Sequence, residues 1–190
     1  DSSCTYPSCN ITPMCDDFES GSTVTYSWLL AQQTYASVYL DSSTFSGLNF
    51  TSIGPIAGSW TLTFEGGDAA TGWTSYATEA QRYANTTHTS SATICLDMSN
   101  ASSSCEMTFD LNLYSGFANV GYSNMRVHVN GTVIPDIAGN TSYNNGAAPF
   151  PNGGAATPQT ITYNMSPYSG ASSVSVTFEF AGKYSEQYST

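Results

Sequence analysis

The chain contains only two histidines, His88 and His128, and these are its candidates for general acid–base catalysis. Histidine is the most common general base in enzymes. His128 lies beside Arg126 on the outward face of a predicted hairpin, and His88 lies in a predicted loop. The sequence contains neither a Gly-x-Ser-x-Gly motif nor the paired carboxylates of a retaining glycosidase. We therefore expect a non-catalytic protein. A hydrolase would need two carboxylates, or a histidine and a carboxylate, that meet in a cleft.

Carboxylates gather at two places where they could bind a hard cation. Asp16, Asp17 and Glu19 lie near the start of the expected domain, and Glu65 and Asp68 flank two glycines where a predicted strand ends. Calcium takes about six to eight oxygen ligands from carboxylates and carbonyls, typically from several loops. A bound metal would clamp these loops and stabilise the fold. The alternative is that these residues are solvated charges of an acidic protein.

Asn-x-Ser/Thr sequons are the most distinctive modification signal in the chain. There are seven, at Asn10, Asn49, Asn85, Asn100, Asn130, Asn140 and Asn164. An N-linked glycan is bulky and can be carried only at the surface of a protein that enters a secretory compartment. We therefore expect a secreted, extracellular glycoprotein. The chain begins at Asp1 without a basic and apolar leader, so we interpret it as a mature protein whose signal peptide has been removed.

Cysteine usage agrees with an oxidising compartment. The five cysteines are Cys4, Cys9, Cys15, Cys95 and Cys105. Cys95 and Cys105 bracket a short polar loop between two apolar strands, so we expect a local disulfide there, contributing about 2–3 kcal/mol on the loop-entropy model. Cys105 is in phase with Met107 but Cys95 is out of phase with Ile94, so this bridge would need a twist or bulge. The other three cysteines would share one bridge and leave one thiol free or bonded between molecules.

Composition excludes several classes of partner. Charged residues are only 9% of the chain and the net charge is −11, with Arg82, Arg126 and Lys183 as the only strong bases. Such a chain cannot neutralise the phosphates of nucleic acid or bind an anionic membrane surface. No apolar run is long enough to insert into a membrane. With 190 residues, 40% of them hydrophobic, the chain can form one folded domain.

The elements that would position these side chains are predicted to be β-strands. Apolar residues alternate with polar residues over 105–113, 174–180 and 60–65, which is typical of strands with one buried face. Further strands are expected near 23–30, 35–40 and 92–97. Asn130-Gly131 between β-branched segments predicts a hairpin with a type I′ turn. No segment has the apolar periodicity of an amphipathic helix over a useful length.

This pattern predicts an antiparallel β-sandwich, which we expect to be a jelly roll. A Cys-containing arm would occupy residues 1–15, and the sandwich with a short tail from Gly182 to Thr190 would occupy residues 16–190. The longest loop, residues 139–158, is long enough to be functional. Aromatic residues in predicted loops could stack on sugars: Trp73, Tyr76, Tyr143, Phe150 and Tyr168. Alternatively, such residues fold back onto the core.

The order of the motifs carries a resemblance to a known family. Cys15-Asp-Asp-Phe-Glu-Ser-Gly21 opens the domain, and Gly54-Pro55 precedes the strand Gly58–Glu65. A long alternating strand ending in Leu111–Gly116, the Asn-Gly hairpin and the strand Val174–Phe180 follow. In this order the chain resembles MAM domains and the related jelly-roll adhesin modules of bacterial cell surfaces. The Cys-Gly-Trp that usually follows the opening of a MAM domain is replaced by Ser27-Trp28, without a cysteine.

The resemblance implies a non-catalytic domain used for adhesion, self-association or glycan contact. It also implies a structural calcium held by Asp17 and Glu19 together with Glu65 or Asp68. We therefore expect an adhesive or structural subunit, in a filament or surface layer, whose partners are copies of itself or other surface proteins. The sheet edges and the arm 1–15 would make the contacts. The alternative is a carbohydrate-binding module that stacks glycans on loop aromatics.

Overall fold

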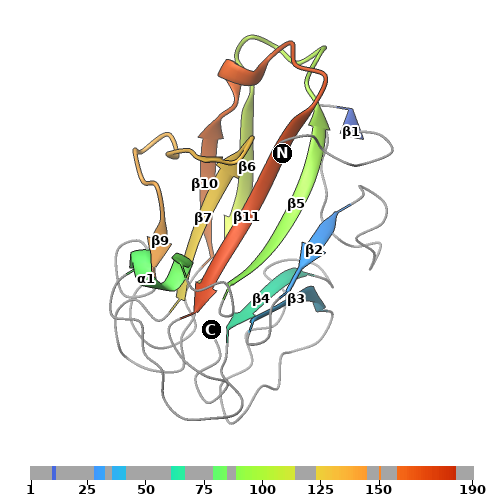
Figure 1. Ribbon diagram of the computed structural model, residues 1–190. Helices are drawn as coiled ribbons and strands as arrows, with labels where there is room; N and C mark the ends of the chain where they lie inside the picture. Colours follow the sequence, from blue (N-terminus) through green and yellow to red (C-terminus); the bar gives the residue numbers. More distant parts are fainter. Residues whose placement is uncertain are drawn as a thin grey trace, which may run out of the picture.

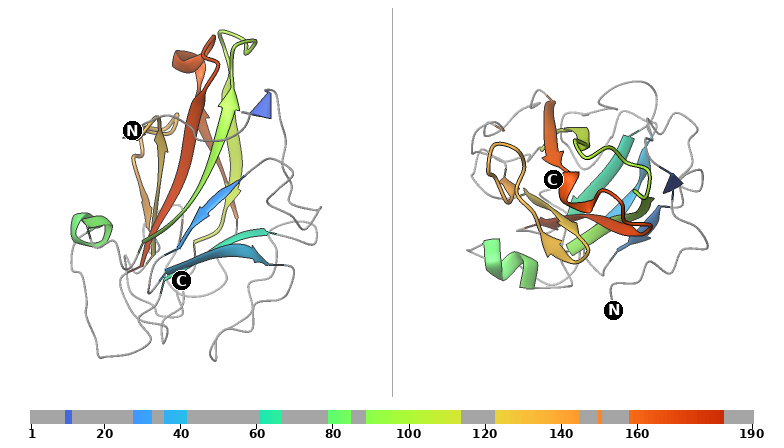
Figure 2. Two further views of the ribbon diagram at one scale, coloured as in Figure 1. Left: turned by 45° about the vertical axis from the view of Figure 1, so that its right-hand side comes forward. Right: turned by 90° about the horizontal axis from the view of Figure 1, so that it is seen from above.

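The computed structural model describes residues 10–11, 28–32, 36–41, 61–66, 79–84, 89–113, 123–144, 150 and 158–182. Strands dominate these residues and lie in two layers (Figures 1 and 2). All but one of the strand pairs are antiparallel. The expected all-β antiparallel sandwich is therefore confirmed.

The larger sheet is built around one central strand. Its seven strands are β1 (Asn10–Ile11), β2 (Leu29–Ala31), β5 (Thr89–Asp97), β7 (Ser123–Val129), β8 (Thr132–Val133), β9 (Tyr143–Asn144) and β11 (Val174–Gly182). β11 lies between β5 and β7 and is antiparallel to both (Figure 1). β1 and β2 lie along the other side of β5, and β8 and β9 pair with β7.

Period-two alternation decides which face of this sheet is buried. Val174, Val176, Phe178 and Phe180 of β11 point into the core, and the residues between them point outward. The register places Val176 between Ile94 of β5 and Val129 of β7, so apolar side chains of three strands lie side by side. Burying such a row stabilises the sheet because its apolar surface leaves water.

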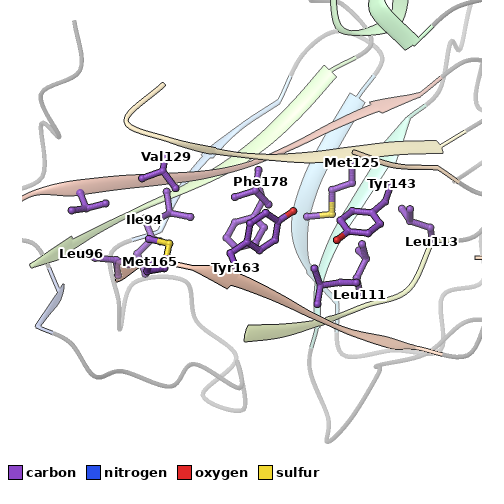
Figure 3. Packing of buried hydrophobic residues seen from close by; sticks show 14 of the residues in the cluster. Ile94, Leu96, Leu111, Leu113, Met125, Val129, Tyr143, Tyr163, Met165 and Phe178 are labelled. Carbon is purple, nitrogen blue, oxygen red and sulfur yellow. The ribbon is translucent and has the colours of Figure 1, made fainter. Parts of the chain in front are cut away.

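The second layer closes the core from the other side. It contains two antiparallel pairs, β6 (Glu106–Leu111) with β10 (Gln159–Asn164) and β3 (Ala36–Asp41) with β4 (Thr61–Gly66). The ring of Phe109 on β6 stacks on Tyr163 at 5.9 Å between centroids and meets Phe178 edge-on at 5.0 Å. Phe109 thus joins the two layers, and Figure 3 shows Tyr163 and Phe178 near the middle of the core.

The predicted hairpin is present, with its turn at Asn130-Gly131. Both residues have positive φ angles, 50° and 78°, as a type I′ turn requires. Asn130 also binds the start of β11. Its backbone N–H donates to the Ser175 carbonyl at 2.8 Å, and its side-chain oxygen accepts from the Ser175 N–H at 2.9 Å. The turn is therefore fixed to β11 as well as to its own strands.

Two helical segments among the described residues were not predicted. They are α1 (Glu79–Ala84) and the 3-10 helix η2 (Ser166–Tyr168), each too short to produce a helical apolar stripe in the sequence. β10 was also not anticipated. None of the helices among the described residues is long and apolar enough to cross a lipid bilayer.

The disulfide prediction is corrected by the structure. Cys95 is disulfide-bonded and Cys105 carries a free thiol, so the expected Cys95–Cys105 bridge is wrong. Cys95 lies on the outward face of β5 and is fully buried, whereas Cys105 packs against the core at the start of β6. Cys95 is out of phase with Ile94 and Leu96 in the sequence because its side chain points to the opposite face of β5. Its partner is one of the three cysteines that lie outside the described residues.

The pairing of β1 with β5 leads to a testable prediction. Asn10 pairs with Leu96 and Ile11 with Asp97, so continuing this parallel register by one residue matches Cys9 with Cys95. Paired residues of neighbouring strands are close enough for a disulfide. We expect peptide mapping of the non-reduced protein to find a Cys9–Cys95 peptide. A peptide that links Cys95 to Cys4 or Cys15 would show that the register does not continue.

Candidate functional site

The outward face of the larger sheet carries a cluster of ionisable side chains, which we call the Glu179 cluster: Glu179, Arg126, His128 and Tyr83. Glu179 on β11 faces Arg126 and His128 on β7. One carboxylate oxygen, Oε2, lies 2.6 Å from Arg126 Nε and 2.7 Å from His128 Nε2. The side chains of Glu179 and His128 are 20% and 18% exposed, so the pair is largely shielded from water.

The electrostatics of the cluster favour an ionised Glu179. Burial tends to raise the pKa of this carboxyl group, but the hydrogen bonds from His128 and Arg126 and the positive charge of Arg126 outweigh it. The pKa of Glu179 is therefore lower than its ordinary value. A partly buried carboxylate of this kind is stable because each of its charge-assisted contacts replaces lost water.

The short helix α1 covers this cluster. Tyr83 is buried, and Arg126 lies over its ring with the guanidinium carbon 3.7 Å from the ring centroid. Such a contact between a cation and an aromatic face is attractive, and more so where water is displaced. Burial, reinforced by the charge of Glu79, raises the pKa of Tyr83, so its phenol stays neutral. The cluster thus connects α1 to both β7 and β11.

His128 and Glu179 are thus a histidine and a carboxylate in contact, which is one of the pairs that a hydrolase would need. Arg126 binds the same oxygen as His128, which holds the carboxylate in place as an anion. On the same face, the hydroxyl oxygens of Thr93 and Thr177 bond to each other at 2.9 Å. Both Arg126 and His128 were placed on the outward face by sequence, but Glu179 was missed as their partner. It lies 53 residues from Arg126 along the chain, and only the pairing of β7 with β11 brings them together.

A second polar cluster fixes the segment after β8. The Asp136 carboxylate accepts hydrogen bonds from the Tyr143 hydroxyl, from the Asn140 backbone N–H at 2.7 Å and from Asn140 Nδ2 at 2.9 Å. Burial tends to raise the pKa of Asp136, but these bonds outweigh it and lower the pKa. The turn is closed by Gly139, whose φ of 91° suits glycine.

The loop aromatics expected to contact sugars include residues that the structure places in the core. Tyr143 and Phe150 are 4% and 0% exposed, and their rings meet edge-on at 5.9 Å. The Tyr143 ring completes the core while its hydroxyl finds Asp136, which is why it folds inward. The prediction of these two residues as a sugar platform is wrong. Tyr168 is half-buried and packs against the same core, and Trp73 and Tyr76 lie outside the described residues.

The predicted metal ligands are not brought together by the part of the chain that the structure describes. Asp17, Glu19 and Asp68 lie outside it, and Glu65 is described only through its backbone in β4, paired with Ser37. No group of three His, Cys, Asp or Glu residues converges within the described ranges. The calcium site therefore remains a prediction from the sequence.

Four predicted glycosylation sites have described side chains, and all four are exposed: Asn100, Asn130, Asn140 and Asn164. Asn10 is described through its backbone in β1, and Asn49 and Asn85 lie outside the described residues. Exposure of every describable site is what glycosylation requires, because the sugar must reach solvent.

Comparison of the chain with protein-family models, with curated proteins and with solved structures finds no match.

We predict that the Glu179 cluster contributes to stability. Replacing Glu179 with Gln removes the charge that Arg126 binds, and we expect the free energy of unfolding at pH 7 to fall by about 1–3 kcal/mol. Urea denaturation followed by fluorescence measures this change. Glu106→Gln is a matched control, since Glu106 lies on the exposed side of β6. Equal losses in the two variants would contradict a special role for Glu179.

The same cluster predicts a pH dependence. Because the pKa of Glu179 is lowered from its ordinary value of 4.5, its stabilisation is complete above that pH and is lost as pH falls through the folded-state pKa. The difference in unfolding free energy between the wild type and the E179Q variant should therefore shrink between pH 7 and pH 3. A difference that stays constant over this interval would show that Glu179 is not the group that titrates.

Proposed function

We propose that the protein is a secreted, non-catalytic surface glycoprotein that acts as an adhesive or structural subunit by associating with copies of itself. The observation that carries this proposal is an exposed leucine on a short strand at the edge of the larger sheet. Jelly-roll topology, a MAM-like origin and a structural calcium are parts of the same proposal, and their support comes from the sequence.

Secretion is supported by the covalent chemistry of the chain. The disulfide at Cys95 needs an oxidising compartment to persist. The four exposed sequon side chains agree with passage through a compartment where N-glycans are attached. The low content of charged residues, 9%, agrees with a surface that relies on hydroxyl groups and sugars for solubility.

Self-association is supported by the edge formed by β2. Among the described strands β2 pairs with β5 alone. Its Leu29 side chain is 55% exposed, although the preceding Trp28 is half-buried with its ring 5.8 Å from that of Phe178. An edge strand offers unpaired backbone groups, and an exposed apolar side chain beside them favours contact with another chain. Since β2 has only three residues, side-chain packing would supply most of the contact.

Two other functions have less support. The sugar-binding alternative loses Tyr143 and Phe150 to the core, as described above. A hydrolase would use the His128–Glu179 pair, but Arg126 already occupies the carboxylate oxygen that His128 contacts. We interpret this pair as part of a stabilising network, so the proposal assigns no catalytic role to either residue.

The proposal predicts that Leu29→Lys weakens association between copies. Burying a leucine contributes about 1.5–3 kcal/mol, and a lysine would introduce a charge at the same place, so we expect the dissociation constant to rise about tenfold or more. Sedimentation velocity over a range of protein concentrations measures this constant. Ile137→Lys is a matched control, since Ile137 is also strongly exposed, at 64%, but lies in the turn after β8 and not on β2.

The two variants separate the possible results. Weakening by Leu29→Lys alone supports the β2 edge as the contact. Equal weakening by both variants would indicate general surface hydrophobicity, and a wild-type protein that stays monomeric at every concentration would contradict self-association itself.

A further inference from the structure

The sequons that the structure describes are not spread evenly over the sandwich. Asn100 follows β5, Asn130 follows β7 and Asn164 ends β10, while Asn10 lies in β1 and pairs with Leu96 near the end of β5. These strand ends meet where β11 begins. We call this part of the molecule the sequon end; in Figure 1 it includes the loop from β5 to β6 and η2.

Hydrogen bonds between the loops show that they form one surface. The Gly170 N–H donates to the Met98 carbonyl at 2.9 Å, which brings the loop after η2 against the loop that carries Asn100. The Met165 N–H, directly after Asn164, donates to the Cys105 carbonyl at 2.9 Å. The backbone N–H of Asn130 donates to Ser175 at the start of β11. Loops far apart in the sequence therefore meet at the sequon end.

A further sequon lies beside this surface. The turn from Asp136 to Asn140 is joined to β10 because the Ile137 N–H donates to the Thr162 carbonyl at 2.9 Å. Thr162 lies two residues before Asn164 in the same strand. Asn140 thus faces solvent near the same end of the sandwich.

We propose that the sequon end is a glycan-covered cap, with N-linked glycans attached to Asn100, Asn130 and Asn164. The cap places three bulky, hydrated groups over loops that are rich in serine, alanine and glycine. Direct packing of one protein surface against another is excluded there, because the glycans separate the two backbones.

The side-chain hydrogen bonds distinguish these sites from Asn140. Asn130 and Asn164 use their oxygen atoms, which accept from the N–H groups of Ser175 and Ser166 at 2.9 and 3.0 Å, so these bonds do not engage the nitrogen that would carry the sugar. In Asn140 the nitrogen itself donates to Asp136 at 2.9 Å. A glycan replaces one of the two hydrogens of that nitrogen and competes with the turn. We therefore expect Asn140 to carry a glycan in a smaller fraction of molecules than Asn130 and Asn164.

The cap has a consequence for association that rests on the proposed function. β2 pairs with β5 at Ser91–Thr93, whereas β1 and the sequon loops adjoin β5 near Leu96 and Asp97. Leu29 therefore lies several residues along the sheet from the cap, while Ile137 lies three residues before Asn140 in the sequence. Of the two exposed large apolar side chains among the described residues, the one on β2 is the one that the proposed cap at Asn100, Asn130 and Asn164 does not cover.

Glycopeptide mapping tests the cap directly. The secreted protein is treated with an amidase that releases N-glycans in ¹⁸O-labelled water, so that each occupied Asn becomes a labelled Asp. Chymotrypsin then supplies the peptides, since the chain has only three Lys and Arg residues. We expect label in most molecules at Asn100, Asn130 and Asn164, and in a smaller fraction at Asn140. Absence of label at the first three sites would overturn the proposal, and full occupancy of Asn140 would overturn the ranking.

Two substitutions of Thr132 form a matched pair that tests glycan attachment at Asn130. Thr132→Ala destroys the sequon of Asn130 but leaves the asparagine, whose side chain holds the turn. Thr132→Ser keeps the sequon. Mass spectrometry of the intact protein should show the loss of one glycan in the first variant and none in the second; equal masses apart from the substitution would contradict attachment at Asn130.

A glycan placed on β2 tests the consequence for association separately. The double variant Leu29→Asn with Ala31→Thr introduces a sequon on the edge strand, and we expect a glycan there to abolish association, while removing the native glycans leaves association intact. Association that disappears when the cap is removed would show that the glycans are part of the contact. A monomeric wild type with a fully glycosylated cap would contradict the proposed function but leave the cap standing.

Discussion

The alternation of β11 is the constraint on which the rest of the structure depends. β11 pairs with β5 on one side and β7 on the other, so both of its edges are held by neighbouring strands. The inward face carries Phe178, which meets Phe109 of the opposite layer and so joins the two sheets. The outward face carries Glu179, which binds two side chains of β7. A shift of the register by one residue would exchange these faces, placing a carboxylate in the core and a phenylalanine ring in water.

The chain has few basic residues, and their placement decides which charges are left at the surface. The chain has three strong bases and a net charge of −11, and yet Arg82 is buried and Arg126 is committed to Glu179. Two of the three bases are thus used inside the fold, since Arg82 is buried in α1 and Arg126 contacts both Tyr83 of α1 and Glu179 of β11. The solubility of the protein then depends on hydroxyl groups, on the excess of carboxylates and, on our account, on the glycans proposed at the sequon end. That division leaves few charges to protect the sheet edge at β2 from contact with another copy.

The sequence predicted those features that depend on local patterns, and it missed those that depend on pairing. Alternation correctly located the strands around Met107, Phe109, Val174 and Val176, and Asn130-Gly131 correctly predicted the turn, because each signal lies within a few residues. The prediction of a local Cys95–Cys105 bridge was wrong because residues that are close in sequence need not be close in space, and the out-of-phase position of Cys95 already opposed the bridge. Tyr143 was misread as a surface aromatic since nothing near it in the sequence reveals its bond to Asp136. The Glu179 cluster likewise required the long-range pairing of β7 with β11.

The assembly state of the native protein tests the central claim most directly. Electron microscopy, together with sizing under reducing and non-reducing conditions, would be applied to protein that has not been deglycosylated. Our account predicts filaments or discrete oligomers that persist when the free thiol of Cys105 is blocked, since the contact at the β2 edge is non-covalent. A protein that remains a monomer at every concentration tested, with and without reductant, would contradict the claim that this sandwich is a self-associating surface subunit.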